Sequence, residues 1–314
     1  MPQSFFVVSG ENVGLARDEV IAISKSYDKK TSYKADSRLV ITNSQVPWEK
    51  IAGRATFVRR AGEIADTFSD LFSEIDLSLL HKSDTFACRI INLSSKKLDT
   101  STIEKTVGGA IKQFSGTRVS LSNPLLTVYL IFTDRGNYFG YAKPTVSPQR
   151  PKKVFRFPSE LPWKLCRAMI NLAGLNECET LCDPFCGTGS ILLEAESMGI
   201  KSIGIDYNKK MCDGAKKNLA ANGYNSKIIN SSYEHMEKIQ DKIDGIVTDL
   251  PYGISSKSSE SPKKLVQDFI SILPKKKKIA LMCKRELADQ IELKLAKRYE
   301  IYRHKSLTRT ILVK

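Results

Sequence analysis

Several features that would assign this chain to a particular class are scarce or missing. Histidine occurs only three times, and no two of the seven cysteines form a CxxC pair, so neither a metal site nor a disulfide framework is expected. Cys178, Cys182 and Cys186 do recur at every fourth position, but Cys182 lies in an apolar run typical of a strand, and no fourth ligand is near. The sequence therefore predicts a protein without a metal.

Long apolar runs are also absent. Residues 125–132 form one of the longest, far short of the roughly 18 that a membrane helix needs. The start, MPQSFFVVSGEN, lacks the charged region and the cleavage site of a signal peptide. We therefore expect a cytoplasmic protein that does not bind a membrane.

Negative charge is in deficit, and the deficit is uneven. The chain carries a net charge of +15, divided into +1 for residues 1–100, +8 for 101–167, −4 for 168–250 and +10 for 251–314. Basic segments attract polyanions such as nucleic acid, whereas a pocket for a cationic small molecule needs carboxylates. The pattern predicts an acidic catalytic core flanked by surfaces that hold a phosphate backbone.

Prolines divide the chain near its middle. Four of them, at positions 144, 148, 151 and 158, cannot lie inside a helix, and we interpret residues 146–158 as a basic linker. Before the linker, short apolar runs (5–8, 39–41, 86–91, 125–132) alternate with helical patterns (15–26, 102–114), which indicates small α+β units.

After the linker, strand and helix patterns alternate regularly, which predicts an α/β fold with a doubly wound, mostly parallel sheet. The expected strands are 180–183, 202–206, 227–230, 245–249, 278–283, 299–302 and 309–314, the last two paired with each other. The expected helices are 190–198, 209–222, 233–239, 262–272 and 286–297. Ligands of such sheets bind at the carboxyl ends of the strands.

The first of these strands ends in Asp183-Pro-Phe185-Cys-Gly187-Thr-Gly189 and leads into a helix. Glycines let the backbone approach a ligand closely, because they have no Cβ. A leading carboxylate would repel a pyrophosphate but suits the positive charges of S-adenosylmethionine, which is the cofactor we expect. A glycine turn that caps an ordinary helix is the alternative.

The second strand ends in Asp206, 23 residues after Asp183. This is the spacing at which an acidic side chain accepts hydrogen bonds from ribose hydroxyls, although an aspartate that caps the next helix has the same pattern. Together with the first motif, it favours the ribose role.

The fourth strand ends in Asp249-Leu250-Pro251-Tyr252-Gly. Methylation of an exocyclic amine requires its nitrogen to become pyramidal, and a carboxylate with a backbone carbonyl can accept the two N–H groups. Asp249 and the Leu250 carbonyl are predicted for this role. Pro251 stiffens the turn and Tyr252 offers a face on which an extruded base can stack. A Pro-Tyr-Gly turn with an incidental aspartate is the alternative.

Basic residues gather in the linker and near the end of the chain. They predict contacts to the phosphates of a folded RNA, against the alternative of an ordinary solvated surface. The predicted RNA-binding residues are Lys143, Arg150, Lys152, Lys153, Arg156, Arg303, Lys305 and Arg309.

With these motifs in place, the chain resembles the archaeal tRNA guanine-10 N2-methyltransferases. Members of this family join a ferredoxin-like unit and a THUMP RNA-binding domain to a Rossmann-like class I S-adenosylmethionine-dependent methyltransferase domain with a seven-stranded sheet. The resemblance covers nearly the whole chain and is clearest in FFVVSGENVGLARDE, in residues 86–139, in LPWKLCRAMINLA, DPFCGTGSILLEA and TDLPYG, and in the closing SLTR. It implies an N-terminal RNA-binding region over residues 1–145 and a methyltransferase domain over 159–314.

The resemblance also implies roles for single residues. Asp183, Phe185, Gly187 and Gly189 would contact the cofactor and Asp206 its ribose, while Asp249 and Tyr252 would contact the target guanine. The family usually has an aspartate near the adenine after the third strand. This chain has Asn230 and Ser231 instead, so one of these carries the adenine contact or it is lost. Leu250 replaces a second proline, but its backbone carbonyl keeps the expected role.

The predicted function is therefore transfer of methyl groups to N2 of guanosine 10 in tRNA, giving dimethylguanosine. Three alternatives stay open. One is an N2-guanosine methyltransferase for another tRNA or ribosomal RNA position, and another is a DNA or protein amine methyltransferase. The third is a catalytically silent tRNA-binding subunit.

Overall fold

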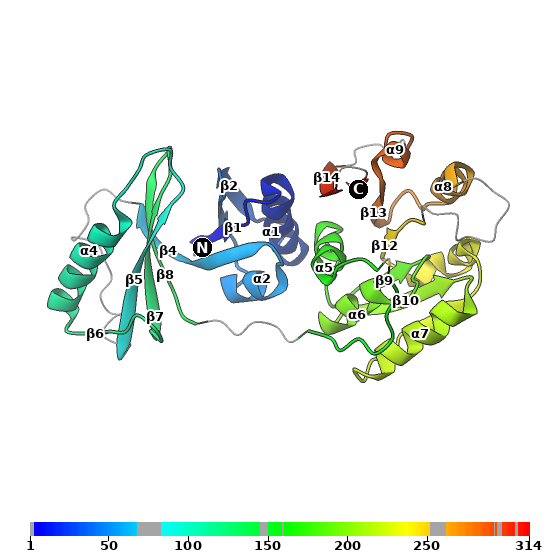
Figure 1. Ribbon diagram of the computed structural model, residues 1–314, viewed down its shortest axis with the longest axis horizontal. Coiled ribbons are helices and arrows are strands. Elements are labelled where there is room, and N and C mark those ends of the chain that lie inside the picture. Colours follow the sequence, from blue (N-terminus) through cyan, green and yellow to red (C-terminus); the bar gives the residue numbers. More distant parts are fainter. Residues whose placement is uncertain are drawn as a thin grey trace. The chain divides into compact units, whose positions relative to one another are not determined.

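The chain forms two units, Met1–Pro148 and Gln149–Lys314, each with its own β-sheet (Figure 1). The computed structural model describes residues 3–67, 83–144, 150–158, 160–251, 262–291, 293, 297–304 and 307–314. Within these ranges, no helix combines the length and the apolar character that a membrane span requires.

The first unit has an eight-stranded sheet in the order β2-β3-β1-β4-β8-β7-β5-β6. The ten-residue strand β4 pairs with β1 on one side and with β8 on the other, so it joins two α+β halves into one sheet. The strands are β1 (Gln3–Val8), β2 (Ser32–Asp36), β3 (Leu39–Asn43), β4 (Val58–Thr67), β5 (Thr85–Asn92), β6 (Arg118–Val119), β7 (Leu126–Phe132) and β8 (Asn137–Ala142).

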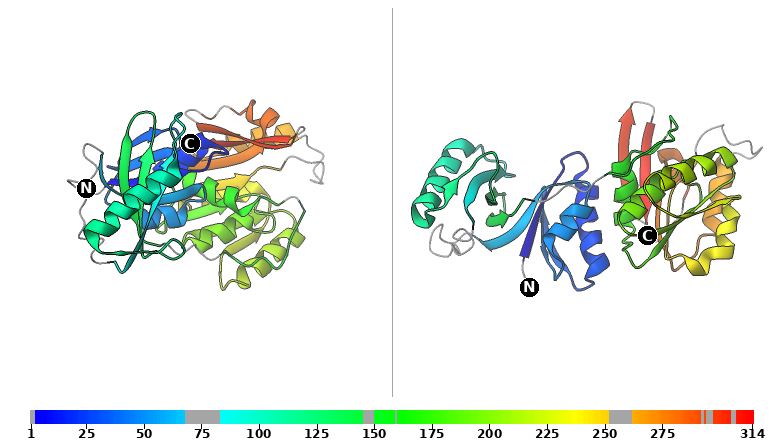
Figure 2. Two further views of the ribbon diagram at one scale, coloured as in Figure 1. Left: turned by 60° about the vertical axis from the view of Figure 1, so that its left-hand side comes forward. Right: turned by 90° about the horizontal axis from the view of Figure 1, so that it is seen from below.

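Helices cover this sheet in two places. In sequence order they are α1 (Val13–Tyr27), α2 (Trp48–Arg54) and α4 (Thr100–Ser115). The first two pack against β1, β3 and β4, and α4 packs against β5 (Figure 2). Strand β8 passes close to the ring of Phe5 at Gly140. A Cβ at this position would stand 2.7 Å from that ring. The four apolar runs and two helical patterns expected in this half all lie in such elements.

The second unit has a seven-stranded sheet in the order β11-β10-β9-β12-β13-β15-β14. The first five strands in this order are parallel, and β15 is antiparallel to both of its neighbours, which confirms the predicted fold class. The strands are β9 (Thr180–Asp183), β10 (Lys201–Asp206), β11 (Lys227–Asn230), β12 (Gly245–Asp249), β13 (Lys278–Lys284), β14 (Lys297–His304) and β15 (Leu307–Val313).

Helices pack on both faces of this sheet. Alternate strand residues, such as Ile279 and Leu281, join one apolar core with Met236 and Phe269 from the helices of that face. The helices are α5 (Trp163–Leu172), α6 (Ser190–Ser197), α7 (Lys209–Ala220), the 3₁₀ helix η1 (Tyr233–Lys242), α8 (Pro262–Ser271) and α9 (Arg285–Ala288). Helices α6 and α7 contact β10, and the core with η1 and α8 covers the other side.

One predicted helix is shorter than expected. Among the described residues of 286–297, only those up to Ala288 are helical, in α9; 289–291 and 293 are not helical, and Lys297 already begins β14. The strand starts early because it pairs with all of β15, with Lys297 opposite Val313. The predicted pairing of the last two strands is confirmed.

Strand order fixes where a ligand can bind. The sheet of the second unit starts with β9 and adds β10 and β11 on one side of it, and β12 then lies on the other side of β9. The connections that leave β9 and β12 therefore run in opposite directions, which opens a crevice at the carboxyl ends of these two strands.

Candidate active site

The loop between β9 and α6 is held by two glycines in left-handed backbone conformations. Gly187 has φ of 51° and Gly189 has φ of 81°, values that other residues adopt only at a cost. The Gly189 N–H donates to the Cys186 carbonyl at 2.8 Å, and Gly187 donates to the Asp206 carboxylate at 2.8 Å. The loop thereby wraps closely around the end of β9.

Asp183, at the end of β9, carries a buried carboxyl group. The Thr248 hydroxyl donates to it at 2.6 Å and the Phe185 N–H at 3.2 Å. Burial nonetheless dominates and raises the pKa of the Asp183 carboxyl from 3.8 to about 7, with smaller contributions from the charges of Asp249 and Asp206. Within the described residues, the hydrogen bonds to this carboxylate come from neutral donors, so it is suited to receive a cation.

The end of β12 faces the same crevice. Asp249 accepts a hydrogen bond from the guanidinium of Arg309, and the Leu250 N–H donates to the Met282 carbonyl at 2.8 Å. Pro251 follows directly. Leu250 is fully buried, so the turn is anchored in the core.

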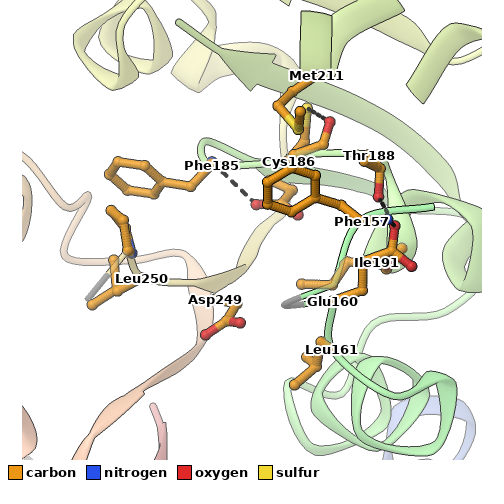
Figure 3. A pocket seen from close by; sticks show the side chains of 14 residues that line it. Phe157, Glu160, Leu161, Phe185, Cys186, Thr188, Ile191, Met211, Asp249 and Leu250 are labelled. Carbon is orange, nitrogen blue, oxygen red and sulfur yellow. Dashed lines mark hydrogen bonds between the residues drawn. The ribbon is translucent and has the colours of Figure 1, made fainter. Parts of the chain in front are cut away.

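Both loops line one cavity of about 280 Å³ (Figure 3). Six predicted site residues border it: Asp183, Phe185, Gly187, Asp249, Leu250 and Pro251. The close-up shows Phe185 and Leu250 at one end and Thr188 with Glu160 at the other. The cavity therefore combines a buried carboxylate, a bare glycine backbone and an apolar wall.

Glu160 supplies another carboxylate to the cavity. The Thr188 hydroxyl donates to it at 2.6 Å, and the Lys153 ammonium lies 2.9 Å from it. Partial burial alone would raise its pKa, but the bonds from Thr188 and Lys153 outweigh burial and hold the pKa of the Glu160 carboxyl below its usual value. Lys153 also donates to the Ser190 hydroxyl at 2.6 Å, which ties this group to the start of α6.

The segment that carries Lys153 is bound to α7. Asn218 accepts the N–H groups of Val154 and Phe155 and donates to the carbonyls of Phe155 and Thr188. Asn222 exchanges two hydrogen bonds with the backbone of Lys152. We call residues 150–157 the strap. It belongs to the second unit, and Asn218 connects it directly to the glycine loop.

Comparison with known proteins gives this arrangement a family. A model described as an RMKL-like methyltransferase domain matches residues 150–306, and a DNA methylase model matches residues 3–217. A tRNA (guanine(10)-N2)-dimethyltransferase of Methanothermobacter thermautotrophicus is 31% identical to the chain, and the match covers 93% of each protein. The chain therefore belongs to the family of tRNA (guanine(10)-N2)-dimethyltransferases. A relative of the same name from Methanocaldococcus jannaschii is 27% identical over 98% of both proteins.

Solved structures agree with the fold of this methyltransferase. TrmN from Thermus thermophilus matches 99% of both chains with a TM-score of 0.57 at 17% identity. SMU.472, a methyltransferase solved with S-adenosylhomocysteine, matches 99% of this chain and 97% of its own with a TM-score of 0.52 at 12% identity.

Four predicted cofactor residues lie off the cavity wall. Asp206 holds the N–H groups of Gly187 and Asn208, and Gly189 packs against α7, where a Cβ would stand 3.2 Å from Ala215. Asn230 donates to the carbonyls of Asp206 and Tyr207, and the Ser231 N–H donates to Asp206 as well. These contacts join the ends of β10 and β11 behind the glycine loop.

The predicted RNA-binding residues divide into three groups. Lys143, Arg150, Lys152 and Arg156 are exposed, as expected. Lys153 and Arg309 have other partners: Lys153 is 13% exposed and engaged with Glu160, and Arg309 is buried against Asp249, so contacts of these two residues with RNA remain predictions. The side chains of Arg303 and Lys305, like the predicted catalytic residue Tyr252, lie outside the described residues.

Sequence patterns missed Glu160, Thr188 and the anchoring role of Arg309. The segment around Glu160, with prolines on both sides, has the composition of a linker, and its contacts come from residues far along the chain. Glu160 is the one acidic residue in the basic stretch 143–167, and this is the pattern that could have pointed to it.

Proposed function

We propose that this chain methylates N2 of guanosine 10 in tRNA, with S-adenosylmethionine as the methyl donor, and adds two methyl groups. The observation that carries the proposal is the placement of Asp249, Leu250 and Pro251 on the wall of the cavity that Asp183 and Gly187 also line. A family relationship over nearly the whole chain supports the tRNA substrate.

The residues fit the cofactor. Asp183 presents a buried carboxylate whose pKa is raised to about 7, and a cation beside it restores the ionised form. Gly187 leaves open space where a Cβ would stand, and Phe185 and Ile191 provide apolar contact. Glu160, held ionised by Lys153 and Thr188, adds negative charge at the other end. S-adenosylmethionine has a sulfonium and an ammonium group, which match these charges.

When bound, the cofactor supplies an electrophilic methyl group: the N2 lone pair forms the new N–C bond, the C–S bond breaks with its electrons to sulfur, and a proton of the amine passes to water. The chain's part is to orient the amine. In the first transfer, Asp249 and the Leu250 carbonyl accept hydrogen bonds from the two N–H groups, and in the second transfer one of them accepts from the N–H that remains; this directs the lone pair out of the plane of the base. Strong base is not required, because the nitrogen becomes acidic once it is methylated.

The first unit and the exposed strap residues are proposed to hold the tRNA. The net charges of +8 over residues 101–167 and +10 over 251–314 support this, since they place basic segments on both sides of the acidic segment 168–250 in the sequence. Residues 1–145 would comprise the ferredoxin-like and THUMP regions, joined by residues 146–158 to the catalytic domain at 159–314.

A labelling experiment tests the proposal. Full-length protein is incubated with a tRNA transcript and S-adenosylmethionine carrying a labelled methyl group, and the modified nucleoside is mapped. We expect label at guanosine 10 as dimethylguanosine and none in a transcript with adenosine at that position. Label at another guanosine would favour a related specificity, such as that of the tRNA (guanine(6)-N2)-methyltransferase of Methanocaldococcus jannaschii, which is 24% identical over 61% of this chain.

A further inference from the structure

Arg309 is a charged side chain that the proposed chemistry does not use directly, although it touches the central carboxylate. It lies on β15, its side chain is 3% exposed, and its Nη2 donates to Oδ1 of Asp249. Burying a guanidinium is costly unless a charged partner accepts its hydrogen bonds. Asp249 is such a partner, and its side chain keeps an exposure of 21%.

The sheet explains why an arginine is required here. Strand β13 lies between β12 and β15, so the two partners come from strands about 10 Å apart. Arg309 is paired with Lys284, at the carboxyl end of β13, and reaches across that end to Asp249. Arginine has the length for this span, and its guanidinium is less strongly hydrated than an ammonium, which favours it in a buried pair.

The guanidinium approaches Asp249 from the protein side. Asp249 lines the cavity, whereas Arg309 does not. A carboxylate oxygen has two lone-pair sites, so the Arg309 contact leaves Asp249 with the capacity to accept an amine N–H. Fixing one oxygen also restricts rotation of the side chain, and catalytic groups must be held within about 0.5 Å of their productive position.

We propose that Arg309 is a positioning residue, which orients the Asp249 carboxylate toward the amine of the substrate without touching the substrate itself. The inference rests on the proposed function, since it assigns Asp249 to the amine. It gives the last strand a part in the reaction, although that strand lies 60 residues from the catalytic motif in sequence.

The test compares three full-length single variants on the RNA that the wild type methylates. Arg309→Gln should lower kcat about 10- to 100-fold. Changes of this size are typical when a residue that orients another functional side chain is removed. The Kd for S-adenosylmethionine should change less than about twofold. Arg309→Lys should recover part of kcat, because it keeps the charge but not the fork. Arg298→Gln is the matched control: it removes a surface pair with Asp289 from the adjacent strand and should leave kcat unchanged.

A double-mutant cycle separates positioning from a merely structural role. If Arg309 acts through Asp249, adding Arg309→Gln to Asp249→Ala should lower kcat less than about twofold further. Wild-type kcat in Arg309→Gln would overturn the inference, as would an equal loss in both backgrounds or a parallel rise of the cofactor Kd. Should Arg309→Gln not fold, Arg309→Lys with undiminished kcat and cofactor affinity would overturn it too. An unlabelled guanosine 10 in the wild-type reaction contradicts the proposed function instead, and leaves the Arg309 comparison to be made on the RNA that is labelled.

Discussion

The cavity has two aspartates at the ends of neighbouring strands, and the surroundings of their carboxylates differ. Asp183 on β9 is held by the Thr248 hydroxyl and a backbone N–H, and burial raises its pKa to about 7. Asp249 on β12 receives a guanidinium from β15. Among the described residues, one carboxylate is thus desolvated without a cation beside it, whereas the other is paired with the guanidinium of Arg309.

This difference indicates which kind of ligand group each aspartate binds best. A carboxylate whose charge is poorly compensated gains most when a cationic ligand arrives. A carboxylate that is already paired gains little from a cation, but it is oriented for hydrogen bonding to a neutral amine. We therefore expect changes at Asp183 to alter cofactor affinity and changes at Asp249 to alter turnover.

The largest effect is expected for Asp249→Ala. Turnover should fall about 10²- to 10³-fold, the scale for losing one positioned electrostatic group, with little change in the Kd for S-adenosylmethionine. Because the change also leaves Arg309 buried without its partner, Asp249→Asn serves as the control that preserves shape, and it should retain more activity. Single-turnover methylation of tRNA measures the rate, and near-normal turnover in the alanine variant would remove Asp249 from the mechanism.

A smaller effect is expected for Asp183→Asn. At pH 8 it should weaken S-adenosylmethionine by about 1.5 to 3 kcal/mol, or roughly 10- to 100-fold, the value of a charge-assisted contact. In the wild type, protonation of Asp183 removes the attraction, so affinity should fall as the pH decreases below about 7. Calorimetric titration at pH 6, 7 and 8 checks both points, and an asparagine variant with the same pH dependence as the wild type would contradict them.

The contrast between the aspartates also shows what sequence can predict. Asp183, Phe185, Gly187, Asp249, Leu250 and Pro251 were all predicted, and all border one cavity. Each stands at the end of a parallel strand or in the loop that follows it, and such strand ends converge whatever the rest of the fold does. Local pattern therefore suffices for residues whose position follows from the strand that carries them.

Arg309 and Glu160 were not predicted in their observed surroundings because their partners are remote in sequence. Arg309 lies in a basic stretch, and its contact with Asp249 depends on β15 inserting between β13 and β14. Glu160 lies among prolines, and its contact depends on Asn218 binding the strap. In the first unit, β4 and β8 were missed because charged residues and a glycine interrupt the alternation that marks a strand.

The pH dependence of stability gives a third, smaller effect of Asp183. Its folded pKa of about 7 exceeds the 3.8 of the unfolded chain, so between these values the folded state binds more protons. This contribution to the free energy of unfolding is fully present below pH 3.8 and is lost as the pH rises through about 7. The free energy of unfolding of the wild type minus that of Asp183→Asn should therefore decrease from pH 5 to 7 and level off above pH 7.

Urea unfolding without ligand measures this difference. Of the two tryptophans, Trp163 lies in the second unit, so a Trp48→Phe background lets its fluorescence report on that unit alone. A difference that does not vary from pH 5 to 8 would mean that Asp183 is not destabilised by burial.

The smallest effect concerns the strap, where neighbouring basic residues differ as the two aspartates do. Lys152 and Arg156 are exposed, whereas Lys153 is 13% exposed and paired with Glu160. If the exposed pair contacts phosphates, changing both to Gln should flatten the dependence of log affinity for tRNA on log salt by up to about 0.7 to 0.9 per contact, because fewer counterions are released. Lys153→Gln is the matched control: because Lys153 is paired with Glu160, its loss should leave that slope unchanged. Filter binding over a range of salt measures the slopes.

An unchanged slope in Lys152→Gln/Arg156→Gln would exclude the strap from RNA binding. A flattened slope in Lys153→Gln would mean that its ammonium leaves Glu160 for a phosphate when tRNA binds.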